Sequence, residues 1–444
     1  MIKPFWSGVQ TPCSGGKREE KTMRKTATAL VSLALASTFA TPLLAADLRM
    51  SWWGGDSRHK ATQEALKVCG EKHGHTIAPE FTGFDGHLEK LMTQIAGRTE
   101  ADIMQVNWPW LPLFSIKGDG FADLNDFSEY IDLSNWTEDQ LASGSMNGKL
   151  NGLPVSTTGR VFFFNTTSFQ KAGLPLPATW DDLFAAAKVL KEKTGPDAYP
   201  MNAIKETAVL LVSLRATQAT GKDLIDPETT TVAWTPEELA AAIDFYGKMV
   251  EGGVVMSQKD AAAEGNINLF ESPKWADGRI AGSYEWDSTY SKFADPLQEG
   301  QKLEAVKLLA SPDARTEGVY RKPSMVFAIS KNSKNPQAAA QIVNCLLNEP
   351  EGIKALGSSR GLPASKTAAK ALADAGSTEM ELIVANAIVT AGAGPTVSPF
   401  NEHPEVRSIF IDTLEEFAYG QIDAEGAAEQ IIEGVNDVLK KFRS

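Results

Sequence analysis

Two tryptophans stand directly before two glycines in the segment Trp52–Asp56. Residues 47–51 alternate in polarity, which predicts a strand, and the polar residues after the glycines can cap a helix that runs to about Lys72. The glycines allow a sharp turn between the two elements. An indole offers a flat apolar face and one N–H donor, and open α/β sheets bind ligands at the carboxyl ends of their strands. Trp52 and Trp53 are therefore either core aromatics or a stacking surface for a ring that carries hydroxyls on its rim.

Aromatic and polar residues also follow the next two expected strands. The segment Gly83–His87 starts a helix, capped by Asp85, whose apolar residues are spaced three, four and seven apart and which ends near Gly97. A strand expected over residues 101–106 then runs into the segment Asn107–Trp110, where the tryptophans either stack on a ligand or cover the core. In a parallel sheet these three loops share one edge. The binding candidates on this edge are Trp52, Trp53, Asp56, Arg58, Phe84, Asp85, His87, Asn107, Trp108 and Trp110.

Length and composition allow one large domain or two lobes. The chain has 444 residues, of which 43% are hydrophobic, and its strand–helix alternation predicts an α/β fold with a mostly parallel sheet. The formal net charge is −13, from 43 basic and 56 acidic residues. Nucleic acids and anionic membranes bind basic surfaces, so neither is an expected partner.

The first 46 residues read as an N-terminal extension and a signal peptide that is removed. A basic segment at Met23–Lys25 precedes the apolar run Ala27–Ala40, which is too short to span a membrane, and the segment Pro42–Ala46 resembles a cleavage region. No cysteine directly follows the apolar run, so we expect export to the periplasm without a lipid anchor. Cys69 and Cys345 could form a disulfide there, but their apolar helical surroundings favour two free, buried thiols.

Five segments, taken in order along the chain, resemble the extracellular solute-binding proteins of carbohydrate ABC transporters, the family that includes maltose-binding protein. They are Lys149–Pro154 with Phe163–Asn165, Ala172–Leu183, Trp275–Ala281 with Trp286, Ser330–Ala339, and Gly361–Ala364. One departure is the pair Phe163-Phe164, where the family usually has a tyrosine before the asparagine. The two tryptophan segments also look like those of members that serve plant-cell-wall oligosaccharides, including oligogalacturonides.

The resemblance implies an α/β, periplasmic binding protein-like fold, with two lobes joined by three crossovers near residues 156–160, 281–286 and 351–360. Lobe 1 is expected to comprise residues 47–157 plus 283–355, and lobe 2 residues 158–282 plus 356–444. The ligand would lie between the lobes, which close on it by hinge bending. The implied function is that of the periplasmic substrate-binding component of an ABC importer. Its partners would be a sugar or oligosaccharide and the inner-membrane permease subunits, and we expect a monomer with no cofactor, no metal and no catalytic residue.

The remaining candidates lie at the expected crossovers and on one loop. They are Tyr284, Glu285, Trp286 and Asp287, with Trp286 as the stacking residue, and the basic residues Arg160, Arg321, Lys322 and Arg360. A guanidinium binds a carboxylate through two hydrogen bonds, which would suit a uronate-containing, pectic oligosaccharide, but these cations could equally pair with carboxylates of the protein. The alternative function is an exported carbohydrate-active enzyme, a polysaccharide lyase or glycosidase, in which Asp56, Asp85, Glu285 or Asp287 would act as acid or base.

Overall fold

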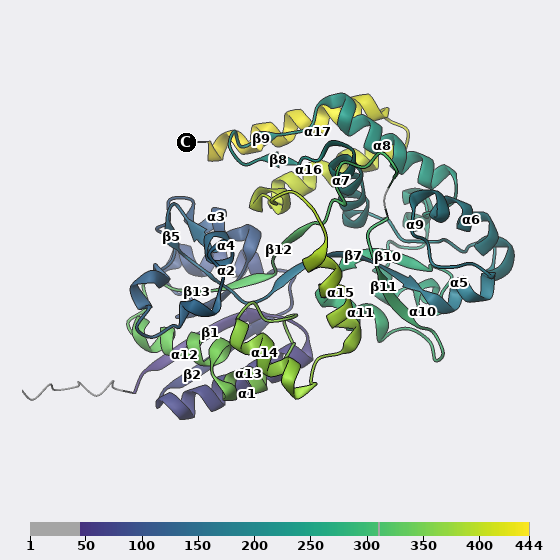
Figure 1. Cartoon of the computed structure of the whole chain (residues 1–444). Helices are drawn as coiled ribbons and strands as arrows, with labels where there is room; N and C mark the ends of the chain where they lie inside the picture. The colour runs from purple at the N-terminus through teal and green to yellow at the C-terminus, as the bar shows by residue number, and fades with distance from the viewer. Residues whose placement is uncertain (1–44, 310, 444) are drawn as a thin grey trace, which may run out of the picture. The chain divides into compact units, whose positions relative to one another are not determined.

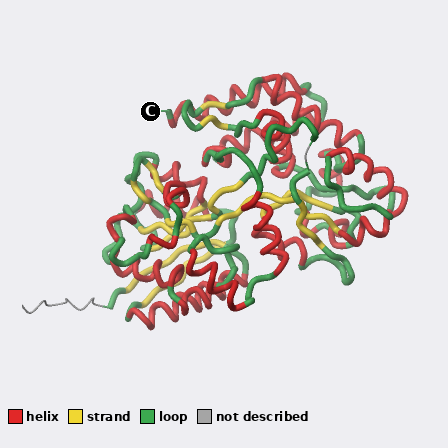
Figure 2. The backbone as a smooth tube through the Cα atoms, viewed as in Figure 1, coloured by secondary structure: helices red, strands yellow, loops and turns green. Residues whose placement is uncertain are grey.

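The computed structural model describes residues 45–309 and 311–443 (Figure 1), so the expected signal peptide lies outside the described residues except for its last two positions. The fold is α/β: strands run through the interior and helices flank them (Figure 2). Within this part of the chain, no helix combines the length and the apolar character that crossing a membrane requires.

The first sheet has five strands in the order β2-β1-β3-β13-β6. They are β1 (Asp47–Trp53), β2 (Thr76–Thr82), β3 (Ile103–Asn107), β6 (Leu153–Pro154) and β13 (Met325–Ile329). Strand β1 pairs in parallel with β2 and β3, whereas β13 pairs antiparallel with β3 and β6. Helices α1 (Asp56–His73), α2 (His87–Gly97), α12 (Pro336–Asn348) and α13 (Pro350–Leu356) accompany this sheet. Figure 1 shows that α12 and α13 lie beside α1, although they are far from it in sequence. Their buried side chains form the first core.

The second sheet has four strands and its own core. Strand β7 (Thr157–Asn165) pairs antiparallel with β10 (Gly282–Trp286), β11 (Leu303–Val306) and β12 (Arg321–Pro323). The helices of this core are α5 (Thr166–Ala172), α6 (Trp180–Thr194), α7 (Glu206–Thr220), α8 (Pro236–Glu251), α16 (Pro404–Ala418) and α17 (Ala424–Leu439). Thr179 and Asp182 form a reciprocal capping box at the N-terminus of helix α6, so its start depends on residues close together in the sequence.

Shorter elements complete the description. The helices are α3 (Leu111–Ser115), α4 (Glu138–Ser143), α9 (Gln258–Ala263), α10 (Pro273–Ala276), α11 (Tyr290–Ala294), α14 (Lys366–Ala375) and α15 (Met380–Ala391). The strands are β4 (Ser145–Met146), β5 (Lys149–Leu150), β8 (Ile225–Asp226) and β9 (Thr231–Val232). The 3-10 helices are η1 (Trp108–Trp110), η2 (Leu124–Phe127), η3 (Leu133–Asn135), η4 (Leu269–Glu271), η5 (Asp287–Thr289), η6 (Pro399–Glu402) and η7 (Lys440–Phe442).

Three passages of the chain between the two cores meet at hydroxyl groups. The hydroxyl of Ser156 donates to the carbonyl of Arg360 at 2.5 Å and also contacts the hydroxyl of Ser324. The amide of Ser324 donates to the carbonyl of Ser156 at 2.9 Å. Ser156 on the first passage is therefore bonded to one residue on each of the other two passages.

The predicted assignment of residues 283–355 to the first lobe does not match the two cores. Tyr284, Phe293 and Leu303 are buried in the second core, because β10 and β11 both pair with β7. The return to the first core falls between Val319 and Met325, about forty residues later than the sequence predicts. Helix α14 (Lys366–Ala375) packs on α12 and α13, so the chain stays with the first core beyond residue 355, where the predicted first lobe ends.

Cys69 and Cys345 form a disulfide that joins α1 to α12, and both residues are completely buried. The prediction of two free thiols was therefore wrong. The apolar surroundings of each cysteine are as expected, but only the packing of the two helices brings the sulfur atoms together.

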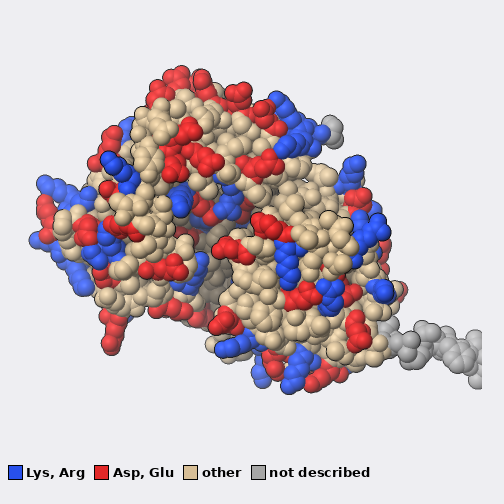
Figure 3. Space-filling model, turned by 180° about the vertical axis from the view of Figure 1, so that it is seen from behind, with Lys and Arg blue, Asp and Glu red and all other residues tan. Residues whose placement is uncertain are grey.

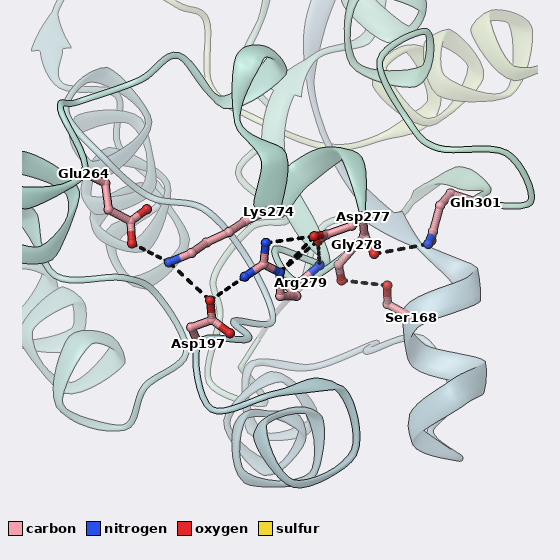
Figure 4. A network of polar contacts seen from close by, with 8 residues as sticks. All are labelled: Ser168, Asp197, Glu264, Lys274, Asp277, Gly278, Arg279 and Gln301. Atoms are coloured by element: carbon pink, nitrogen blue, oxygen red, sulfur yellow. Dashed lines mark hydrogen bonds and ion pairs between the residues drawn. The ribbon is translucent and has the colours of Figure 1, made fainter.

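An ion-pair network holds the segment after α6 to α10 and α5 (Figure 4). Arg279 pairs with Asp197 at 2.5 Å and with Asp277 at 2.8 Å, and Lys274 bridges Asp197 and Glu264. At the other side of the network, the hydroxyl of Ser168 donates to the carbonyl of Gly278 at 2.7 Å. Because these charges are partly exposed, we attribute local ordering rather than a large stabilisation to them.

Candidate functional site

The side chain of Trp286 lies between two cations at the end of β10. Register places Trp286 opposite Arg160 of β7, and the neighbouring strand β12 contributes Lys322. The guanidinium carbon of Arg160 lies 4.4 Å from the centre of the indole, and the Lys322 Nζ lies 4.6 Å from it. Tyr320 packs edge-on against the same indole, with 5.7 Å between ring centres. Three of the sequence candidates are thus brought together by strand pairing.

Lys322 is neutralised by a buried carboxylate. Its Nζ lies 2.7 Å from Glu402 Oε2, and both side chains are buried. Tyr320 donates its hydroxyl to Glu402 Oε1 at 3.0 Å. Burial alone would raise the pKa of Glu402, but the charge of Lys322 and these hydrogen bonds outweigh it and lower the pKa. Glu402 is therefore an ionised partner of Lys322 at neutral pH.

Arg160 is less completely paired. Its side chain is 3% exposed, its Nη1 donates to the carbonyl of Tyr284 at 2.8 Å, and its Nη2 is 3.7 Å from Glu206 Oε1. The Nε of Arg160 is buried and has no partner in the described part of the chain. Glu206 is also in close contact with Arg407. This group contains three cations and two carboxylates. We call it the Trp286 cluster, and its members are Arg160, Glu206, Trp286, Tyr320, Lys322, Glu402 and Arg407.

A cavity of about 1000 Å³ is lined by residues from both cores. Arg321 and Lys322 of β12 lie in its wall, and Trp108 of η1 reaches it from the first core. Arg321 donates to the carbonyls of Val389 and Thr390 and has no carboxylate partner within the described ranges. The polar side chains of the lining include Thr137, Asp139, Gln140, Thr157, Asp226, Asn386 and Thr390. A cavity with cations, an indole and many hydrogen-bonding groups suits a polar ligand with an apolar ring face. On the face shown in Figure 3 the surface is hollowed near the middle, with basic and acidic side chains at the rim.

The carboxyl edge of the first sheet carries an aromatic group, as the loops predict. Trp53 and Trp110 are packed together with 5.5 Å between ring centres, and Phe84 stacks on Trp110 at 5.7 Å. Phe84 is 48% exposed, whereas Trp53 and Trp110 are almost buried. Burial, followed by the nearby charge of Lys90, lowers the pKa of His87 to about 4, so this imidazole is neutral at pH 7. Phe84, Asp56 and Asp85 are exposed members of this edge.

Trp52 belongs to the core. It is fully buried, its indole packs on Phe81, and its Nε1 donates to His59 Nδ1 at 3.1 Å. Residues 50–53 of β1 are all buried, so side chains on both faces of the strand are covered at its carboxyl end. Asp56 and Asp85 do not cap the helices after them: Gly55 and Gly86 occupy the N-cap positions.

Five other candidates are bonded or buried within the protein. Arg360 is buried and donates to Gln105 Oε1 at 2.8 Å and to Thr62 Oγ1 at 2.9 Å, which ties its loop to the first sheet. Arg58 donates to the carbonyl of Ser359 on the same loop at 3.0 Å. Tyr284 is buried against core aromatics, Asn107 is buried at the end of β3, and Asp287 accepts hydrogen bonds from Thr158, Gly159, Ser288 and Asn386.

Sequence reasoning missed Glu206, Tyr320, Glu402 and Arg407 in the Trp286 cluster, and Asn386 and Thr390 in the cavity. These residues lie on different elements and belong to no local motif. Only a buried cation such as Arg160, which needs a counter-charge, could have indicated that acidic residues lie nearby.

The chain matches the family model described as bacterial extracellular solute-binding protein over residues 64–382. The chain belongs to this family. Among solved structures it is similar to a periplasmic solute-binding protein from Pectobacterium atrosepticum, with 36% identity, a TM-score of 0.85, and coverage of 90% of this chain and 100% of that one. It is also similar to a periplasmic oligogalacturonide-binding protein from Yersinia enterocolitica in complex with saturated digalacturonic acid. That match has 38% identity, a TM-score of 0.83, and coverage of 89% of this chain and 99% of that one.

More distant matches support the same fold. A binding protein of Brucella abortus is 26% identical over 307 residues, which are 68% of this chain and 71% of the relative. A cyclic α-maltosyl-1,6-maltose-binding protein from Arthrobacter globiformis is 21% identical with a TM-score of 0.70. The resemblance and the α/β periplasmic binding protein fold are confirmed, and the protein is a solute-binding protein. The family consists of extracellular binding proteins, so this is an exported protein of the binding type.

Proposed function

We propose that this protein captures a uronate-containing oligosaccharide of the galacturonide type in the periplasm and delivers it to the membrane permease of an ABC importer. The observation that carries the proposal is the Trp286 cluster, in which three cations share two carboxylates beside an aromatic face. The Yersinia relative bound to digalacturonic acid supports the same ligand class.

A sugar carboxylate would complete the charge balance of the cluster. Arg160 has a buried Nε without a partner and only a long contact with Glu206, so a ligand carboxylate can take up its remaining hydrogen-bonding capacity. The indole of Trp286 offers an apolar face to the C–H groups of the sugar ring. Arg321, Asn386 and Thr390 in the cavity wall offer polar groups to further hydroxyls or carboxylates.

Ligand binding would act by population shift. The form in which residues of both cores contact the ligand is stabilised relative to a more open form, and the permease would bind that closed form. The junction of Ser156, Ser324 and the Arg360 carbonyl is where the chain can bend between the two lobes. The nearby charge of Lys322 and the hydrogen bonds to Glu402 lower the pKa of that carboxyl, so it is ionised, which suits binding but not proton donation to a glycosidic bond.

Calorimetric titration of the purified protein tests the proposal, with digalacturonate compared with neutral digalactose at matched concentrations. We expect saturable binding of digalacturonate, at least 10-fold weaker binding of the neutral disaccharide, and no product after hours of incubation. Binding of the neutral sugar alone would overturn the uronate assignment. Turnover of either disaccharide would overturn the transport function in favour of an exported lyase or glycosidase.

A further inference from the structure

A second pocket, of about 320 Å³, adjoins the Trp286 cluster within the second core. Its wall is formed by the residues just before α7, the loop after α9, and the end of β10. Glu206 lines this pocket and is also a member of the cluster, and Glu285 of the pocket directly precedes Trp286 in the sequence. The pocket and the Trp286 cluster therefore lie next to each other and share Glu206.

Two lysines in the pocket lack an acidic partner. Lys205 and Lys292 both line it, and neither has a carboxylate within ion-pair distance among residues 45–309 and 311–443. The Nζ of Lys292 lies 4.1 Å from the ring centre of Phe270, which also lines the pocket. The pocket thus offers a positive charge next to an aromatic ring, as the Trp286 cluster does.

Glu285 supplies the opposite function, that of a hydrogen-bond acceptor. Its carboxylate accepts a bond of 2.9 Å from the hydroxyl of Ser283 and lies in no ion pair of the described structure. Burial raises the pKa of Glu285, while the charges of Arg160 and Lys292 act in the other direction. Glu285 and Lys292 line the same pocket, so the pocket offers a hydrogen-bond acceptor for ring hydroxyls as well as a cation for a carboxylate.

The rim of the pocket is held in an unusual backbone conformation. Lys205 has φ 50° and ψ −116°, a combination that side chains other than glycine rarely adopt, whereas the φ of 51° at Asn266 is one that asparagine tolerates. A strained residue such as Lys205 persists where the surrounding structure holds it, and such residues concentrate at binding sites. Ile267, next to Asn266, is 51% exposed at the same rim and offers apolar surface to a ligand.

We infer that this pocket is a subsite for a second uronate unit, with Lys292 and Lys205 binding its carboxylate and Phe270 packing against its ring. The inference rests on the proposed function and adds a minimum ligand length: each galacturonate unit carries one carboxylate, so the cluster and the pocket together take two units. The protein would then distinguish between ligands by how many carboxylates they carry, as well as by whether they carry one at all.

The test is calorimetric titration of wild type, Lys292→Gln and Lys292→Arg with galacturonate and with digalacturonate. Wild type should bind digalacturonate at least ten-fold more tightly than galacturonate. We expect Lys292→Gln to bind digalacturonate about ten-fold more weakly with galacturonate changed less than three-fold, and Lys292→Arg to restore most of the loss. Lys307→Gln, which removes an exposed lysine outside the pocket, is the matched control and should leave both affinities unchanged.

Three results would overturn the inference while leaving the proposed function in place: equal wild-type affinity for the two ligands, unchanged digalacturonate affinity in Lys292→Gln, or an equal loss for both ligands in that variant. Failure of wild type to bind either acid would instead overturn the proposed function itself. The melting temperature of each unliganded variant distinguishes lost binding from lost folding.

Discussion

At the residue scale, the properties of single side chains follow from the charges beside them. Trp286 lies between Arg160 and Lys322, and cation–aromatic contacts of this kind contribute about 0.5–2 kcal/mol each. Trp52 has the same side chain but is enclosed by its own sheet and helix. Two tryptophans of equal chemistry thus have different functions because one faces a polar cluster and the other faces the core.

Trp286→Ala should weaken digalacturonate binding by ten-fold or more, since the variant loses the stacking face and frees Arg160 and Lys322 to move. Its melting temperature should change little because the indole is only half-buried. The comparison is Trp52→Ala, which should lower stability by about 3–5 kcal/mol through a core cavity. Calorimetry and urea unfolding of both variants measure the contrast, and unchanged affinity in Trp286→Ala would exclude the stacking function.

His87 makes stability depend on pH in the mildly acidic range. Burial lowers its pKa from 6.5 to about 4, so the unfolded chain takes up a proton more readily than the folded chain as the pH falls. The contribution of neutral His87 to the free energy of unfolding is therefore present above pH 6.5. It is lost between pH 6.5 and 4, and the loss amounts to about 3 kcal/mol. Urea unfolding at pH 7, 5.5 and 4 should show a smaller loss for His87→Gln than for wild type. Equal losses would mean that His87 titrates normally.

At the element scale, the disulfide between α1 and α12 joins the start of the first core to a helix near residue 340. Cross-links that close long loops restrict the unfolded chain, and removing one from an exported protein costs about 2–5 kcal/mol. Reducing agent should therefore lower the melting temperature of wild type by several degrees. The double variant Cys69→Ala/Cys345→Ala should melt at the lower temperature with or without the agent. A wild type insensitive to complete reduction would contradict a stabilising cross-link.

At the scale of the whole molecule, the two cores are linked by three passages that meet at Ser156, Ser324 and the Arg360 carbonyl. A ligand that contacts both cores should shift the population towards a more compact form. Small-angle scattering should show a smaller radius of gyration when saturating digalacturonate is added. Trp286→Ala at the same ligand concentration should show little change, and an unchanged wild-type radius would contradict closure on the ligand.

Local pattern predicted much of the fold. The alternation at residues 47–51, the capping box of Thr179 and Asp182, and the start of α12 at Pro336 each depend on neighbours within one or two turns. The aromatic edge of the first sheet was also predictable, because the carboxyl ends of parallel strands converge. The family resemblance indicated the class of ligand before any contact was known.

Only the tertiary structure decided which residues meet across long separations. Strand pairing of β10 with β7 moves residues 283–319 into the second core, helix packing brings Cys69 to Cys345, and the Trp286 cluster joins residues 160, 206, 286, 322, 402 and 407. The physical reason for this division is that the propensity of a segment depends on nearby residues. Strand register and helix packing depend instead on burying the whole set of apolar faces at once. The sequence by itself determined the elements and the family, and the packing of those elements determined the site.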